Sequence, residues 1–118
     1  IWRFKYIMNG MAVQDESLKT DQIHTSSIRQ YDKDAGKWYV TFYSSAAPSS
    51  SLTAWEGGMK NDEMILYKEQ QAPNGMEGFY KITFYDISKK GFNWKGEWVD
   101  PEEKFVYPTW YLFCTKRN

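Results

Sequence analysis

Apolar residues, many of them aromatic, recur at every second position through most of this chain. The alternation is clearest in the stretches Trp2-Phe4-Tyr6-Met8, Trp38-Val40-Phe42, Tyr80-Ile82-Phe84 and Phe92-Trp94. Successive side chains of a β-strand point to opposite faces of a sheet, so a period of two predicts strands with one apolar face. No segment repeats its apolar residues at the spacing of an amphipathic helix. The pattern therefore predicts an all-β protein.

Turn-forming residues divide the alternating stretches into strands. We expect strands at residues 1–8, 23–31, 37–44, 52–56, 63–68, 79–87, 92–99 and 105–115, with one more after the first turn. Eight or nine strands joined by short hairpins indicate an antiparallel up-and-down meander. A meander that closes on itself covers its edge strands, so we predict a single lipocalin-like β-barrel domain over residues 1–118. A sandwich is the alternative, but sandwiches usually need longer connections.

The first turn determines how the first hairpin pairs. Asn9-Gly10 between apolar stretches is a strong signal for a type I′ turn, because both residues tolerate positive φ. That turn predicts the facing pairs Met8 and Met11, Tyr6 and Val13, Phe4 and Asp15, and Trp2 and Ser17. These pairs share the apolar side, so we expect Asp15 to point toward the core, where an unpaired carboxylate is costly.

Arg29 and Tyr31 lie two positions apart on one predicted strand and so share a face. A guanidinium and a phenol together can hold the carboxylate of an anionic ligand, since the guanidinium offers a bidentate fork and the phenol a further donor. Alternatively, Arg29 pairs with the inward carboxylate of Asp15, and the two charges neutralise each other. We favour this structural ion pair, because buried charges are usually paired.

Composition narrows the classes of function. Fifteen Lys and Arg residues balance fifteen Asp and Glu residues, whereas a nucleic-acid-binding surface normally carries a clustered basic excess. No apolar run reaches the about 18 residues that span a bilayer. Nucleophile-elbow, phosphate-loop and zinc-helix motifs are absent from the sequence. We therefore expect no nucleic-acid partner, no membrane insertion, no cofactor and no enzyme activity.

Three smaller features have simple interpretations. Cys114 alternates with Trp110 and Leu112, which predicts a buried and unreactive thiol. His24 is the one histidine and lacks the neighbouring ligands of a zinc site, so we expect it on a strand surface. Residues 32–36 begin like a calcium loop but lack its closing glutamate, which predicts a solvated hairpin turn.

Several longer stretches resemble a known family. They are Trp2-Arg3-Phe4-Lys5-Tyr6-Ile7-Met8-Asn9-Gly10-Met11-Ala12-Val13-Gln14-Asp15, Arg29-Gln30-Tyr31-Asp32 with Gly36-Lys37-Trp38, and Phe84-Tyr85-Asp86-Ile87 with Phe92-Asn93-Trp94. Together they are similar to a bacterial, lipocalin-like family of calycin barrels that is largely uncharacterised. The resemblance implies a small β-barrel with an internal cavity and no agreed activity. Members of that family carry a further N-terminal strand, so we expect native sequence upstream of Ile1 and leave full closure of the barrel open.

We therefore predict a calycin-like, non-enzymatic protein that binds a small apolar or aromatic ligand, neutral or anionic, in the barrel interior. The residues expected to contact this ligand are Trp2, Tyr6, Asp15, Arg29, Tyr31, Trp38, Phe84, Trp94 and Trp98. The alternative is a structural or protein-interaction barrel whose aromatic residues simply fill the core. An open edge at residues 1–8 or 105–115 would favour a homodimer. We expect a soluble protein, with the cytoplasm slightly favoured because no signal peptide is visible.

Overall fold

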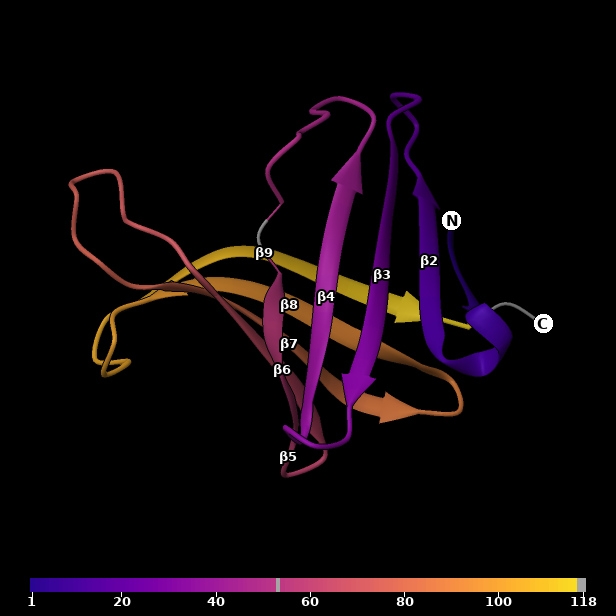
Figure 1. Ribbon diagram of the computed structural model, residues 1–118. Coiled ribbons are helices and arrows are strands. Elements are labelled where there is room, and N and C mark those ends of the chain that lie inside the picture. The colour runs from indigo at the N-terminus through magenta and orange to yellow at the C-terminus, as the bar shows by residue number, and fades with distance from the viewer. Residues whose placement is uncertain (53, 117–118) are drawn as a thin grey trace. The chain divides into compact units, whose positions relative to one another are not determined.

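The computed structural model describes residues 1–52 and 54–116 of the chain. These residues form nine β-strands that follow one another in up-and-down order (Figure 1). The strand pairs are antiparallel, which confirms the predicted all-β meander. The chain divides into two compact units, Ile1–Glu56 and Gly57–Asn118, and each is described by itself. A single closed barrel domain stays a prediction.

The first unit is a run of hairpins. Its strands are β1 (Trp2–Ile7), β2 (Ala12–Leu18), β3 (His24–Asp32) and β4 (Lys37–Ser44), and β5 (Trp55–Lys60) begins at its end. A short 3-10 turn, η1 (Met8–Gly10), joins β1 to β2. Strands β2, β3 and β4 lie side by side, as Figure 1 shows.

The first hairpin has the predicted register along its strands, but Met8 belongs to the turn instead of the first strand, because the strand pairs end at Ile7 and Ala12 and Met8 has a φ of 52°. Strands β1 and β2 pair Trp2 with Ser17, Phe4 with Asp15 and Tyr6 with Val13. Asn9 and Gly10 have φ values of 54° and 85°, as the central residues of a type I′ turn require. The Met11 N–H donates to the Met8 carbonyl oxygen at 3.1 Å and closes the turn. The Asn9-Gly10 turn signal was therefore sufficient to predict the face of the sheet on which Asp15 lies.

Residues 32–36 form the predicted hairpin turn between β3 and β4. One carboxylate oxygen of Asp32 accepts the backbone N–H groups of Asp34 and Ala35 at 3.0 and 3.2 Å. The Gly36 N–H donates to the Asp32 carbonyl oxygen at 2.8 Å. The Asp32 side chain thus stabilises the turn, as aspartate commonly does at this position.

The second unit contains most of β5 and the remaining strands. These are β6 (Glu63–Glu69), β7 (Phe79–Ser88), β8 (Gly91–Val99) and β9 (Val106–Thr115). Strand β9 runs beside β8 (Figure 1), but its register shifts where Trp110 faces Gly96 and Pro108 faces Glu97. Thr109 is the extra residue of this β-bulge, which breaks the regular pairing of β9 into two segments.

Both boundaries of one predicted strand were wrong. The strand predicted at 52–56 begins instead at Trp55 and continues through Gly57 to Lys60, and Thr53 lies outside the described residues. A Cβ at Gly57 would lie 1.9 Å from the Ile65 carbonyl oxygen, so glycine here permits a close approach of two strands instead of ending one. The actual turn is Asn61-Asp62, where φ is 53° and 64°.

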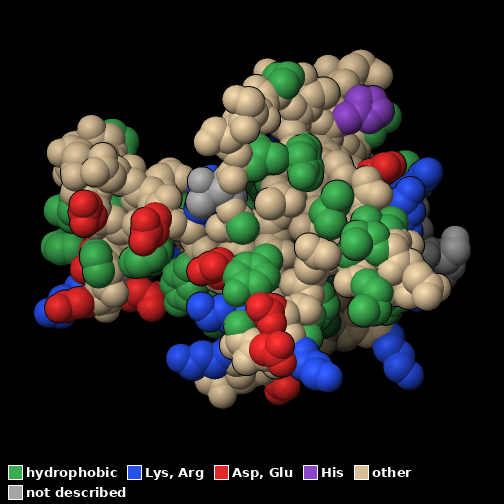
Figure 2. Space-filling view, in the orientation of Figure 1, with side chains coloured by type: hydrophobic (Ala, Val, Ile, Leu, Met, Phe, Trp, Pro, Cys, Tyr) green, Lys and Arg blue, Asp and Glu red, His purple; other side chains and the backbone are tan. Residues whose placement is uncertain are grey.

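Both units have small cores. The buried apolar side chains are Ala12, Val40 and Trp55 in the first unit and Leu66, Trp98 and Val99 in the second. Many hydrophobic side chains reach the surface instead (Figure 2). The apolar face of the first hairpin is thus less covered than predicted, since Tyr6 exposes 78 % of its surface. In the part of the chain that the structure describes, no helix has the length and apolar character needed to cross a membrane.

Candidate functional site: a polar network beneath exposed aromatic rings

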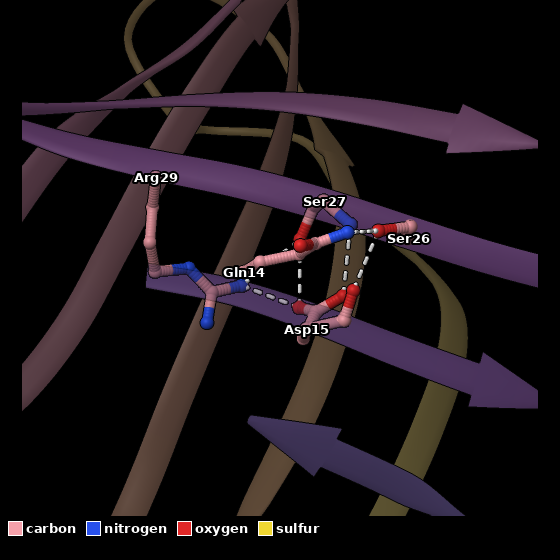
Figure 3. Close-up of polar contacts among 5 residues, drawn as sticks. All are labelled: Gln14, Asp15, Ser26, Ser27 and Arg29. Carbon is pink, nitrogen blue, oxygen red and sulfur yellow. Dashed lines mark hydrogen bonds and ion pairs between the residues drawn. The ribbon is translucent and has the colours of Figure 1, made fainter. Parts of the chain in front are cut away.

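A buried polar network joins β2 to β3 in the first unit (Figure 3). Asp15 is only 4 % exposed, and Ser27 faces it across the strand pair. The Ser27 backbone N–H donates to Asp15 Oδ1 at 2.9 Å, and the Ser27 hydroxyl donates to Oδ2 at 2.6 Å. Arg29 completes the network with an ion pair in which Nη2 lies 2.7 Å from Oδ2. Each carboxylate oxygen of Asp15 therefore has a donor.

Strand alternation brings these three side chains together. Ser27 and Arg29 are two positions apart on β3 and so point to the same face as Asp15. Arg29 reaches the carboxylate diagonally across the strand pair, which is within range of a long side chain. The predicted ion pair between Arg29 and Asp15 is confirmed. Ser27 was not among the predicted residues: alternation places it on the face of Arg29, but a neutral hydroxyl does not require a partner as a buried charge does.

The opposite face of the same strands carries a second link. The Gln14 side-chain amide donates to the Ser26 hydroxyl at 3.2 Å, and that hydroxyl donates to the Asp15 carbonyl oxygen at 2.6 Å (Figure 3). Hydrogen bonds on both sides of the sheet therefore fix β2 against β3 at Asp15. A network satisfied in this way holds its members in one geometry.

Aromatic side chains surround the network on its own face. Phe4 faces Asp15 from β1, and the Arg29 guanidinium carbon lies 5.2 Å from the centroid of the Phe4 ring. The Trp2 and Phe4 rings are 5.2 Å apart. This arrangement places a cation against the negative face of a ring, a contact that is favourable in proteins.

The same face continues onto β4. Tyr31 faces Trp38 with ring centroids 5.3 Å apart, and Phe42 faces Ser27. We call the following set the aromatic face of the first unit: Trp2, Phe4, Tyr6, Tyr31, Trp38 and Phe42. Phe4, Tyr6, Tyr31 and Phe42 each expose between 43 % and 78 % of their surface. The predicted residues Trp2, Tyr6, Asp15, Arg29, Tyr31 and Trp38 thus lie on one face of one unit.

The remaining predicted residues lie in the second unit. Phe84 and Trp94 face each other on β7 and β8, and the Phe84 and Phe92 rings are 5.4 Å apart. Trp98 is only 7 % exposed, and its indole N–H donates to the Gln70 carbonyl oxygen at 2.9 Å. Trp98 therefore holds the connection that follows β6 in place, since its ring is buried and its N–H is hydrogen-bonded to that connection.

A surface cluster in the second unit links Tyr67, Lys81 and Glu103. The Lys81 ammonium lies 2.7 Å from Glu103 Oε1, and the Tyr67 hydroxyl donates to Glu103 Oε2 at 3.3 Å. Desolvation by burial raises the pKa of Tyr67. Burial by itself would lower the pKa of Lys81, but the hydrogen bond to Glu103 and the neighbouring charges raise it overall. Both groups therefore stay protonated at neutral pH, which suits a structural contact better than a base or nucleophile.

The single cysteine and the single histidine lie in different units. The Cys114 thiol is half-buried, so the prediction of a buried side chain was wrong in degree. Desolvation raises the pKa of Cys114, which lowers its thiolate fraction and its reactivity. His24 is exposed at the start of β3, which confirms its predicted place on a strand surface.

Comparisons with known proteins add no relative. No family model, no curated protein and no solved structure matches this chain. Among the described residues, no group of three or more His, Cys, Asp or Glu side chains converges as a metal site would require. The chemistry of the aromatic face and its polar network therefore has to be read from the geometry alone.

Proposed function

We propose that this protein is a non-enzymatic binding protein that holds a small, partly apolar molecule on the aromatic face of the first unit. One observation carries the proposal: four aromatic side chains of that face, Phe4, Tyr6, Tyr31 and Phe42, stay exposed around a rigid polar network. Exposed apolar patches of this kind commonly mark sites of interaction. The resemblance to lipocalin-like barrels implies an internal cavity but no agreed activity, so the proposal rests on the exposed aromatic rings.

The aromatic rings favour a flat ligand. Ring faces stack well against planar molecules, and their burial against a ligand removes apolar surface from water. Polar groups then fix the orientation of the ligand within an otherwise apolar site. In this face the candidates are the Tyr31 hydroxyl and the edge of the Asp15–Arg29 network.

The charge balance of the network favours a neutral ligand over an acid. Arg29 and Asp15 form an ion pair at 2.7 Å, so a ligand carboxylate would have to compete with Asp15 for the guanidinium. Displacing one partner of a buried pair leaves the other charge uncompensated, which is costly. We therefore expect neutral aromatic molecules to bind more tightly than aromatic acids or fatty acids of similar size.

A thermal-shift screen tests the proposal, because a ligand that binds only the folded state raises the melting temperature. We expect stabilisation by planar neutral aromatics, and Phe42→Ala is expected to weaken binding by about tenfold. Tyr43→Ala is the matched control, since Tyr43 is the next residue on β4 and faces the opposite side of the sheet. Equal losses from both variants, or no ligand-induced shift in any class, would contradict the proposal.

A further inference from the structure

Strand β9 presents an unusually apolar surface. It is the last strand of the sheet order, and the described pairings give it one neighbour, β8. The aromatic residues of this segment are exposed as follows: Phe105 60 %, Tyr107 66 %, Trp110 57 %, Tyr111 50 % and Phe113 74 %. Trp110 faces Gly96 and Tyr111 faces Lys95, so neighbouring side chains lie on opposite faces and both faces of β9 are apolar. A strand at the end of a sheet order is a template on which another strand can pair.

The absence of charge on β9 indicates what it binds. Residues 105–115 include no Lys, Arg, Asp or Glu, whereas the other terminal strand, β1, carries exposed Arg3 and Lys5. Charged residues on an edge strand discourage pairing with another chain. Two copies of β1 would bring like charges together, but two copies of β9 meet no such repulsion. A neutral apolar strand is thus complementary to itself.

The 110–115 segment offers apolar surface as well as backbone for an interface between copies. At about 200 Å² for each aromatic side chain, the exposed fractions of Trp110, Tyr111 and Phe113 amount to roughly 360 Å², and Leu112 is exposed as well. A standard interface buries about 800 Å² on each partner, so these side chains supply a little under half of that area. Pairing at a strand edge gains its affinity mainly from main-chain hydrogen bonds, which the backbone of the segment has to supply.

The β-bulge determines which part of β9 can pair. Pro108 lacks an N–H, and Thr109 is the bulged residue, so both interrupt the first segment. The segment from Trp110 to Thr115 is regularly paired with β8. In a symmetric antiparallel pair that extends the sheet, facing residues must point to the same side, so the two-fold axis passes through one residue. If this axis passes through Leu112, Leu112 faces its own copy and Tyr111 faces Phe113 of the second copy.

We propose that the 110–115 segment of β9 binds the same segment of a second copy of this chain and forms a symmetric, edge-to-edge dimer. Each segment thus pairs with an uncharged, aromatic edge strand of identical sequence. The proposal is independent of ligand binding on the first unit, because it uses side chains and backbone of β9 alone.

Sedimentation velocity of the whole chain at micromolar concentration tests this proposal. We expect a dimer for the unchanged protein and a monomer for Phe113→Lys, because the lysine brings a charge to both sides of the axis. Ile87→Lys is the matched control, since Ile87 is also half-exposed in the second unit but lies on β7. That variant is expected to remain a dimer. Circular dichroism checks that both variants keep their strands.

A cross-linking experiment tests the register. In a Cys114→Ser background, Leu112→Cys would place two thiols next to each other at the axis, so mild oxidation is expected to yield a disulfide-linked dimer. Ile87→Cys in the same background is expected to stay monomeric on denaturing gels. A monomer at all concentrations, a Phe113→Lys variant that still dimerises, or open polymers in place of a dimer would each overturn the proposal.

Discussion

The two units hold their ion pairs in contrasting surroundings. Arg29 to Asp15 in the first unit and Lys81 to Glu103 in the second both have nitrogen–oxygen distances of 2.7 Å. The Asp15 side chain is only 6 % exposed, however, whereas that of Glu103 is 41 % exposed. A buried charge that loses its partner is costly, whereas a surface pair contributes little because water replaces the lost contact. Equal distances therefore do not imply equal energies.

The two units also differ in whether their buried polar side chains have hydrogen-bond partners. Asp15 in the first unit accepts hydrogen bonds at both carboxylate oxygens. In the second unit the Thr83 hydroxyl is buried on β7 and has no hydrogen-bond partner among the described atoms. Buried polar groups stabilise a fold only when they are satisfied. The hydrogen-bonded network in the first unit thus holds β2 and β3 in one geometry. The Thr83 hydroxyl in the second unit, by contrast, lowers the stability of the fold.

The largest effect is expected at the buried pair. Arg29→Ala should lower the free energy of unfolding by roughly 3 kcal/mol or more, because Asp15 keeps a buried charge without its cation. Asp15→Asn should also destabilise, and the double variant should lose less than the sum of the two single losses. Urea denaturation measures all three, with Arg3→Ala as an exposed control. Strict additivity would show that the two side chains do not depend on each other.

Thr83 should respond in the opposite direction. Thr83→Val keeps the shape of the side chain and removes a buried hydroxyl without a partner, so we expect a gain of about 1 kcal/mol in unfolding free energy. Thr41→Val on β4 is a control, because Thr41 is only half-buried and little change is expected there. Urea denaturation measures both variants. A loss of stability in Thr83→Val would mean that the hydroxyl has a water or other partner, and the contrast between the units would disappear.

The features that the sequence predicted are those set by residues close together in the chain. The Asn9-Gly10 turn fixed the register of the first hairpin, and strand alternation then placed Asp15 and Arg29 on one face. The Lys81–Glu103 pair has no such local signal, because Glu103 lies in the turn before β9 and reaches back to β7. Alternation also shows which side chains share a face but not how much covers that face, so the exposure of Tyr6 was not foreseen.

Glycine was ambiguous for a similar reason. Gly57-Gly58 has the composition of a turn, but its surroundings show that Gly57 permits close contact with the backbone at Ile65. The true turn, Asn61-Asp62, lacks glycine and relies on the tolerance of Asn and Asp for positive φ. Sequence alone cannot separate these two uses of glycine, because the neighbouring strand is brought there by the fold.

The smallest effect is expected at the surface pair and concerns pH. Because the pKa values of Tyr67 and Lys81 are raised in the folded state, the folded protein binds protons more tightly than the unfolded chain. The resulting stability is fully present below the unfolded pKa values of about 10 and is lost as pH rises through the folded values. Urea denaturation from about pH 8 to pH 11 should therefore show a stability contribution that holds up to about pH 10 and falls above it.

Glu103→Gln separates this pair from other alkaline effects. It removes the carboxylate that raises the pKa of Lys81, so the loss of stability with rising pH should become shallower. At neutral pH the substitution should cost only about 0.5 kcal/mol, because Glu103 is well exposed. Glu102→Gln is the matched control, since Glu102 pairs with Lys104 at the surface. A Glu103→Gln loss as large as that of Arg29→Ala would show that exposure does not distinguish the two pairs.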